Sequence, residues 1–203
     1  GCIWVDMEKT GVDILISAPQ KGWSAPPSAG LVMMRSVAIE KCRAAKSTSF
    51  AIDLGKWLTI MDAYLAGGHA YHATMPTDAL RVFHAAMLET KAIGFEKLRA
   101  AQWEQGNAVR QMLAAHGVRS VAAEGFAAPG VVVSFTADPE VQAGRKFAAL
   151  GLQIAAGVPL MVDEGADYRS FRIGLFGLDK LKDVSASLAR LEAAFAQVFG
   201  ASA

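Results

Sequence analysis

Short apolar runs and longer stretches of helical period divide the first half of the chain. The runs VDILIS (residues 12–17) and LVMM (31–34) are typical of strands covered on both faces, because their apolar residues are consecutive. Glycines and prolines between the two runs exclude a helix there, so the chain opens as strand, loop and strand. The spacing of apolar residues then predicts helices over residues 37–46 and 51–66, from Pro76 onward, and over residues 95–116.

Strands alternate with helices in the last third of the chain, and this alternation predicts an α/β fold. We place a domain boundary at residue 93, inside helical sequence, which gives a first part of residues 1–93 and a second part of residues 94–203. In the second part the pattern predicts strands over residues 131–136, 153–156 and 171–176, and helices over residues 138–150 and 178–199.

Composition limits the classes of partner. The net charge is +1, so nothing favours nucleic acid or a membrane surface. No apolar stretch is long enough to cross a bilayer. Two cysteines are too few for a disulfide framework, and we therefore expect an intracellular, cytoplasmic location. The apolar fraction of 53% is high for an isolated soluble domain and indicates a buried interface.

Lys21 stands where open α/β sheets bind ligands, just past the carboxyl end of the first predicted strand. It lies in the stretch SAPQKGWSAPPSAG. One interpretation is a solvated charge in a turn, because exposed lysines are common. The other is a functional amine, since the stem would start from a buried strand and the loop offers no carboxylate to pair with it. Such an amine can attack an aldehyde as a nucleophile.

Arg172 lies on the strand predicted by SFRIGLFG. Alternation places it on one face with Gly174 and Phe176, while their neighbours share the other face. A guanidinium on an apolar strand needs an anionic partner, and a carboxylate bound through two hydrogen bonds is the usual one. Gly174 leaves room beside it for a small substrate. The alternative is an edge-strand charge that pairs with Asp167 or Glu164.

Thr74 precedes Pro76 at a predicted helix start in the stretch AYHATMP. Its hydroxyl and the amides of the first helical turn are groups that bind a phosphate. Tyr71 adds a second hydroxyl three residues earlier. The plainer interpretation is that Thr74 is an ordinary N-cap residue.

Two other kinds of chemistry find little support. His69 and His72 have the spacing of half a metal site, but no cysteine or carboxylate completes a set, so we expect no metal. Cys42 lies on a basic helix without a histidine partner, which disfavours a cysteine nucleophile.

Three stretches together resemble a known family. SAPQKGWSAPPSAGLVMM, AYHATMPTDAL and SFRIGLFG are similar, in this order, to class V aminotransferases of the fold-type I pyridoxal-phosphate superfamily, in particular the alanine–glyoxylate and serine–pyruvate aminotransferases. The resemblance implies the C-terminal half of that fold, namely part of the large-domain sheet and the small α/β domain. It also implies transamination between a small amino acid, alanine or serine, and a 2-oxo acid, glyoxylate or pyruvate.

The resemblance implies a role for each matched residue. Lys21 matches the lysine that forms a Schiff base with pyridoxal 5′-phosphate and moves the substrate proton, and Gln20 matches the glutamine beside it. Tyr71 and Thr74 match cofactor-phosphate ligands that reach across from the neighbouring subunit, which implies a homodimer with shared active sites. Arg172 matches the arginine that binds the substrate carboxylate.

The sequence departs from the family because the family's N-terminal part finds no match. That part holds the loop on the cofactor phosphate, the aromatic residue on the ring and the aspartate under the pyridine nitrogen, with which neither Asp6 nor Asp13 aligns. We therefore expect the 203-residue chain alone to be inactive. The alternatives are a non-catalytic dimerisation piece, or another class V enzyme such as a lyase or a desulfurase, although desulfurases carry histidine in place of Gln20.

Overall fold

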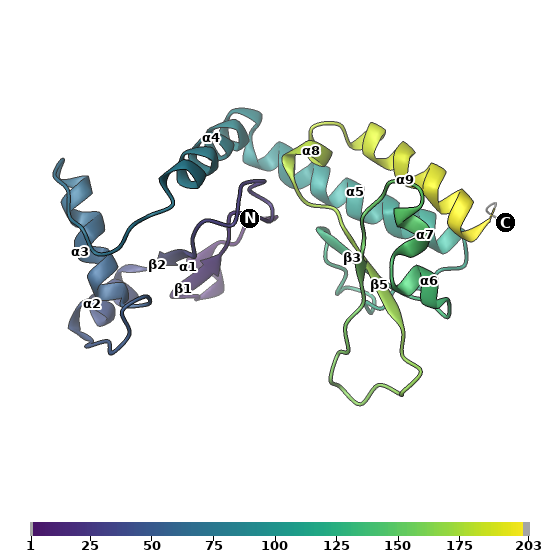
Figure 1. Ribbon diagram of the computed structural model, residues 1–203, viewed down its shortest axis with the longest axis horizontal. Coiled ribbons are helices and arrows are strands. Elements are labelled where there is room, and N and C mark those ends of the chain that lie inside the picture. The colour runs from purple at the N-terminus through teal and green to yellow at the C-terminus, as the bar shows by residue number, and fades with distance from the viewer. Residues whose placement is uncertain (1, 201–203) are drawn as a thin grey trace.

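The computed structural model describes residues 2–200, which form two lobes joined end to end (Figure 1). The N-terminal lobe, residues 2–93, contains a two-stranded antiparallel sheet in which Ile16 pairs with Val32. Helix α4 runs from this lobe toward the other one (Figure 1). The elements of the N-terminal lobe are α1 (Met7–Thr10), β1 (Ile14–Ser17), β2 (Leu31–Met34), α2 (Ser36–Ala44), α3 (Leu54–Leu65) and α4 (Thr77–Ile93).

The C-terminal lobe, residues 94–200, holds a three-stranded antiparallel sheet in the order β3-β5-β4. Helices α5 and α9 run beside each other over this sheet (Figure 1). The elements of this lobe are α5 (Phe95–Ala115), β3 (Val131–Phe135), α6 (Pro139–Gln142), α7 (Arg145–Ala148), β4 (Ala155–Ala156), β5 (Ser170–Gly174), α8 (Leu178–Leu181) and α9 (Val184–Phe199).

The main hydrophobic core lies in the C-terminal lobe, between the sheet and helices α5, α7 and α9. The prediction of one helix over residues 138–150 is wrong, because Gly144 takes a left-handed φ of 74° and separates α6 from α7. The prediction of one helix over residues 178–199 is also wrong. Asp183 accepts a hydrogen bond from the Ala186 N–H and so begins α9 as a new helix.

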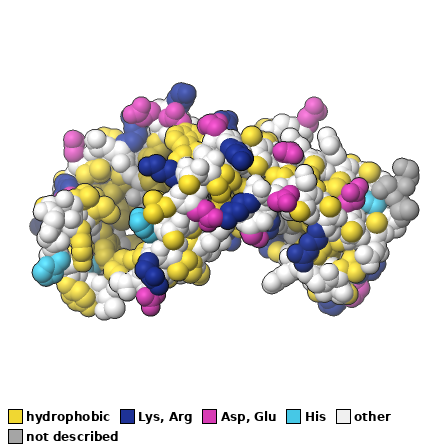
Figure 2. Space-filling view, turned by 90° about the horizontal axis from the view of Figure 1, so that it is seen from above, with side chains coloured by type: hydrophobic (Ala, Val, Ile, Leu, Met, Phe, Trp, Pro, Cys, Tyr) yellow, Lys and Arg dark blue, Asp and Glu magenta, His cyan; other side chains and the backbone are white. Residues whose placement is uncertain are grey.

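The apolar runs predicted that both strands of the N-terminal lobe would be covered on both faces. This prediction is wrong. Ile16 is 72% exposed, because nothing between Cys2 and Gly200 packs on that side of the hairpin. Figure 2 shows apolar side chains gathered over this lobe, at the left of the view. Among the exposed apolar residues of the lobe are Ile14, Ile16, Phe50, Ile52, Met61, Tyr64, Leu65 and Tyr71.

The break between α4 and α5 falls at Gly94, whose φ of 104° ends the first helix after Ile93. The domain boundary that we place at residue 93 coincides with this break, although the division itself stays a prediction. No helix within residues 2–200 combines the length and the apolar character that a membrane span requires.

Candidate active site

The loop after β1 carries Gln20 and Lys21 and is closed by two backbone hydrogen bonds. Ser24 N–H donates to the Lys21 carbonyl at 3.0 Å, and Ala25 N–H donates to the Pro19 carbonyl at 3.1 Å. Behind this turn, a small apolar cluster that includes Ala25 packs the loop against α4. The turn at the end of β1 is therefore held in one shape by its own backbone and by a helix of the same lobe.

The side chain of Lys21 is exposed, and its Nζ lies 5.7 Å from the centre of the Phe176 ring. The expectation of a stem rising from a buried strand is wrong, because no residue of β1 is buried. Lys21 forms no ion pair within residues 2–200. The carboxylate of Asp179, on the segment after Phe176, pairs with Lys180 at 2.9 Å instead. The amine of Lys21 is thus accessible, with an aromatic face as its neighbour.

Arg172 lies on β5, the central strand of its sheet, and its Nε donates to the Ala156 carbonyl at 2.8 Å. The two faces of the strand are as predicted, because the residues on either side of Arg172 are buried. The alternative of an edge-strand charge paired with Asp167 or Glu164 is wrong, since β3 and β4 flank β5 and no ion pair of Arg172 occurs in the described chain. The terminal nitrogens of its guanidinium remain available for a carboxylate.

The Phe176 ring connects the surroundings of Lys21 and Arg172. A Cβ placed on Gly174 would lie 3.5 Å from this ring, so the ring packs against the glycine that stands two residues from Arg172. The same ring is the one beneath the Lys21 amine. The ring thus lies beside the Lys21 amine and against the glycine two residues from Arg172 on the same strand face. Part of the room that Gly174 was expected to leave is filled by this ring.

Tyr71 and Thr74 are both exposed, and their hydroxyl oxygens lie 3.1 Å apart. Thr74 is not the N-cap of α4, because Pro76 holds that position and no side chain caps the helix. No hydrogen bond or ring contact within residues 2–200 joins either hydroxyl residue to Lys21. The structure brings the two predicted phosphate ligands together, but it does not bring them to the lysine within one chain.

His72 and Cys42 contact neighbouring residues of the N-terminal lobe. His72 shares a hydrogen bond of 2.9 Å with the Phe50 carbonyl and packs against Phe50 and Trp57. Within the described chain no three side chains of the metal-binding types come together. The Cys42 thiol lies 3.7 Å from the Met34 sulfur.

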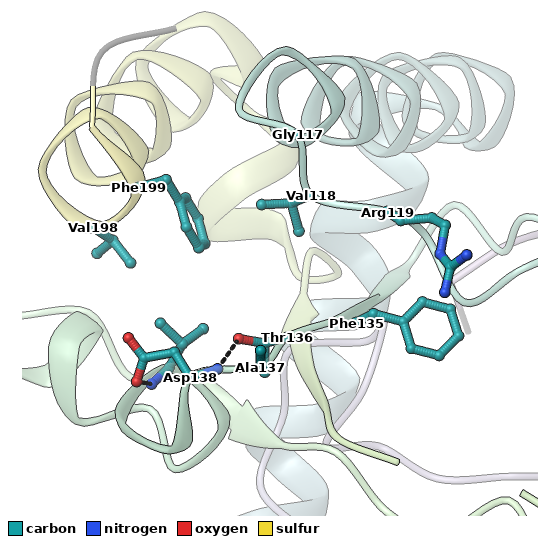
Figure 3. Close-up of a pocket in the computed structure, with 10 residues that line it drawn as sticks. Gly117, Val118, Arg119, Phe135, Thr136, Ala137, Asp138, Val198 and Phe199 are labelled. Atoms are coloured by element: carbon teal, nitrogen blue, oxygen red, sulfur yellow. Dashed lines mark hydrogen bonds between the residues drawn. The ribbon is translucent and has the colours of Figure 1, made fainter. Parts of the chain in front are cut away.

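A separate cavity of about 370 Å³ opens in the C-terminal lobe between the ends of α5 and α9 (Figure 3). Arg119 lies over the Phe135 ring at its rim, with 4.5 Å between the guanidinium carbon and the ring centre. Val118, Val198 and Phe199 give it apolar walls (Figure 3). None of the residues predicted for the site lines this cavity.

Sequence reasoning missed Ser24 and Phe176, the two residues through which the lobes meet at the site. Phe176 was assigned only to the face of Arg172, and nothing in the pattern placed it beside Lys21. Ser24 has a φ of 54°, a conformation rare for residues other than glycine. No local signal predicts that conformation for a serine followed by alanine and proline.

The loop between β4 and β5 hangs away from the sheet (Figure 1) and is organised by one carboxylate. Glu164 accepts hydrogen bonds from the backbone N–H groups of Leu160, Met161 and Val162. These hydrogen bonds lower the pKa of Glu164 from 4.5 to about 2. Since the folded pKa is depressed, the ionised group stabilises the loop above pH 4.5, and this contribution is lost as the pH falls through about 2.

We expect the amide NMR signals of Met161 and Val162 to shift with a midpoint near pH 2, not near 4.5. The Glu164→Gln variant should lose this titration and show the loop signals of the low-pH form at neutral pH. A midpoint at the ordinary glutamate value would contradict the hydrogen-bonded arrangement.

No protein-family model matches the chain, but comparisons with curated proteins and solved structures find relatives. The chain is 28% identical over 196 residues to a 2-aminoethylphosphonate–pyruvate transaminase of Paraburkholderia phymatum. This alignment covers 94% of this chain and 50% of that protein. The chain is also 26% identical over 195 residues to a protein of Anabaena cylindrica named soluble hydrogenase 42 kDa subunit. This alignment covers 95% of this chain and 48% of that protein. The chain thus spans about half the length of the curated relatives that it matches.

The crystal structure of an alanine–glyoxylate aminotransferase from a Nostoc species superposes with a TM-score of 0.77, over 98% of this chain and 51% of that one, at 21% identity. The resemblance to class V aminotransferases is confirmed. The α/β fold predicted for the chain, that of the C-terminal half of a fold-type I transferase, is confirmed with it.

Proposed function

We propose that the chain carries the lysine and arginine of a pyridoxal-phosphate-dependent aminotransferase that acts on a small amino acid, alanine or serine, and on a 2-oxo acid, glyoxylate or pyruvate. The observation that carries this proposal is the Phe176 ring, which lies beneath the Lys21 amine and packs against the glycine next to Arg172 on the strand face. An amine that pairs with no carboxylate within residues 2–200, and a guanidinium whose terminal nitrogens bind no group there, suit an aldehyde cofactor and a carboxylate substrate.

The side chains present fit pyridoxal 5′-phosphate. Lys21 would bind its aldehyde carbon, with Gln20 beside it, and Tyr71 and Thr74 present two hydroxyls 3.1 Å apart that can both donate to a phosphate. When bound, the cofactor supplies an electron sink for the carbon that loses its proton. The chain's own groups must then hold the substrate and move that proton.

Arg172 binds the substrate carboxylate and thereby orients the α-carbon toward Lys21. The Lys21 amine, once free, acts as a general base and takes the proton from the substrate α-carbon. It then acts as a general acid and would return the proton to the carbon on the other side of the substrate nitrogen. Water releases the 2-oxo acid, and the cofactor, when bound, would hold the amino group until a second 2-oxo acid takes it up in the reverse half-reaction. Arg172 binds both acids, since each carries the same carboxylate.

We further propose that the protein acts as a homodimer with shared active sites. Two facts support this: the hydroxyls of Tyr71 and Thr74 do not reach Lys21 within residues 2–200, and the N-terminal lobe exposes a broad apolar surface. The two hydroxyls would bind the phosphate of the cofactor that is held by Lys21 of the neighbouring subunit. The same exposed surface supports the second candidate, in which the 203-residue chain alone is a non-catalytic dimerisation piece.

We also propose a cytoplasmic location. Cys2 and Cys42 are both free thiols, as expected in a reducing compartment.

The proposal is tested by mixing the complete protein, pyridoxal phosphate and an amino donor with glyoxylate or pyruvate. We expect stoichiometric conversion of the donor to its 2-oxo acid, with alanine and serine compared as donors. The 203-residue chain alone should give little or no turnover. Absence of turnover by the complete protein with either donor would refute the transamination, and release of sulfide from cysteine would favour a desulfurase.

A further inference from the structure

Ser24 holds an unusual backbone conformation that serves a contact with the other lobe. Its φ of 54° lies in the left-handed region, which costs free energy for a residue with a Cβ. In this conformation its hydroxyl oxygen accepts a hydrogen bond of 2.7 Å from the N–H of Leu178. Leu178 begins α8, whose N-cap residue is Gly177 and offers no side-chain acceptor. The loop of Lys21 therefore supplies the acceptor that this amide lacks in its own lobe.

The segment of residues 176–178 contacts the lysine loop at two points. Leu178 donates to Ser24, and two residues earlier the Phe176 ring lies 5.7 Å from the Lys21 Nζ. A cation within about 6 Å of a ring face is attracted to it. One contact thus fixes the loop backbone, and the other lies directly under the amine.

The 176–178 segment is itself tied to the centre of the C-terminal lobe. Gln102 on α5 is wholly buried and donates to the carbonyls of Leu175, at 3.2 Å, and Pro129, at 3.1 Å. The N–H of Leu175 donates to the Gly130 carbonyl at 2.9 Å. Since both backbone groups of the residue before Phe176 are held, the position of the segment is set by the C-terminal lobe.

We propose that the C-terminal lobe positions the Lys21 amine through residues 176–178, with Ser24 and Phe176 as positioning residues. The hydroxyl of Ser24 binds the lysine loop to the N–H of Leu178, and the Phe176 ring holds the Lys21 amine over its face. This inference rests on the proposed function of Lys21, because both residues act through that lysine. A movement of the C-terminal lobe relative to the N-terminal lobe would displace the amine from its working position.

The hydroxyl is tested by two substitutions of Ser24 in the complete protein. Ser24→Gly removes the hydroxyl and relieves the left-handed φ, whereas Ser24→Asn keeps an oxygen acceptor on a residue that tolerates this φ. We expect Ser24→Gly to raise amide exchange at Leu178 about tenfold without cofactor, the effect of one lost hydrogen bond. With cofactor, it should weaken the visible circular dichroism of pyridoxal phosphate and lower kcat about tenfold while KM stays within about twofold. In Ser24→Asn, the amide exchange at Leu178, the visible circular dichroism and kcat should all return to the values of the parent protein.

The ring is tested by Phe176→Leu, with Phe135→Leu as the matched control. Both remove a ring beneath a cation, but the Phe135 ring lies under Arg119, beside the separate cavity. We expect only Phe176→Leu to change the visible circular dichroism of the bound cofactor.

The proposal and the function on which it rests fail in different ways. Unchanged exchange at Leu178 in Ser24→Gly, or equal dichroism in Phe176→Leu and the parent protein, would overturn the positioning role. Visible absorbance of the bound cofactor that survives in Lys21→Ala would instead refute the role of Lys21 itself.

Discussion

Replacing Lys21 with arginine in the complete protein should lower the transamination kcat by roughly 10²–10⁴-fold, the contribution of a positioned acid–base group. Arginine keeps the positive charge and the long stem, so the contact with the Phe176 ring can persist. A guanidinium does not lose its proton near neutral pH and so can neither attack an aldehyde nor accept the α-proton. Steady-state kinetics with saturating amino donor measure the loss.

Lys180→Arg is the matched control for this substitution. Lys180 also lies near the site, but its ammonium pairs with the Asp179 carboxylate at 2.9 Å, and arginine preserves that pair. Its kcat should stay within about twofold of the parent value, since an exposed ion pair contributes little free energy. If Lys21→Arg kept more than a tenth of the parent turnover, Lys21 would not be the catalytic amine.

Replacing Arg172 with lysine should raise KM for the amino donor by about 10–100-fold. Lysine keeps the charge but offers a single point of contact, and a charge-assisted hydrogen bond contributes about 1.5–3 kcal/mol. The effect should be similar for the 2-oxo acid, because both substrates present the same carboxylate to Arg172. Initial rates over a range of each substrate separate this change from any change in kcat.

Arg169→Lys is the control for Arg172, since it makes the same chemical change on an exposed residue three positions earlier. KM should then stay at the parent value. An unchanged KM in Arg172→Lys, or an equal rise in both variants, would show that the carboxylate is bound elsewhere.

The helices show which part of the fold the sequence pattern could predict. The span of α5 was predicted almost to the residue, because Gly94 and Gly117 adopt positive φ at either end of a continuous helical period. The single helices expected over residues 138–150 and 178–199 were wrong, because the apolar period continues across each break. Only Gly144 and the capping Asp183 mark the breaks, and both residue types also occur inside helices.

The strands show where pattern reasoning fails for a different reason. Consecutive apolar residues in β1 predicted cover on both faces, yet Ile16 is exposed within this chain. The pattern records that a strand needs cover, but it does not say which polypeptide provides it. β5 was predicted with the correct faces, since its alternation with a period of two is set by local geometry alone.

The candidate site was predictable residue by residue but not as an assembly. Lys21 stood in a loop without a carboxylate and Arg172 on an apolar strand, and the structure places the Phe176 ring beside the Lys21 amine and against Gly174, two residues from Arg172. The contact of the Lys21 loop with residues 176–178 depends on the docking of two lobes, with Ser24 and Leu178 hydrogen-bonded across 154 positions of sequence. No short-range pattern encodes a contact of that separation.

The central claim is that the Lys21 nitrogen bonds covalently to pyridoxal phosphate. The direct test is to treat the cofactor-loaded complete protein with borohydride, which makes an imine bond permanent, and to map the modified peptide by mass spectrometry. The account predicts one pyridoxyl phosphate group per chain, attached at Lys21. Attachment at another lysine, or no attachment at all, would contradict it.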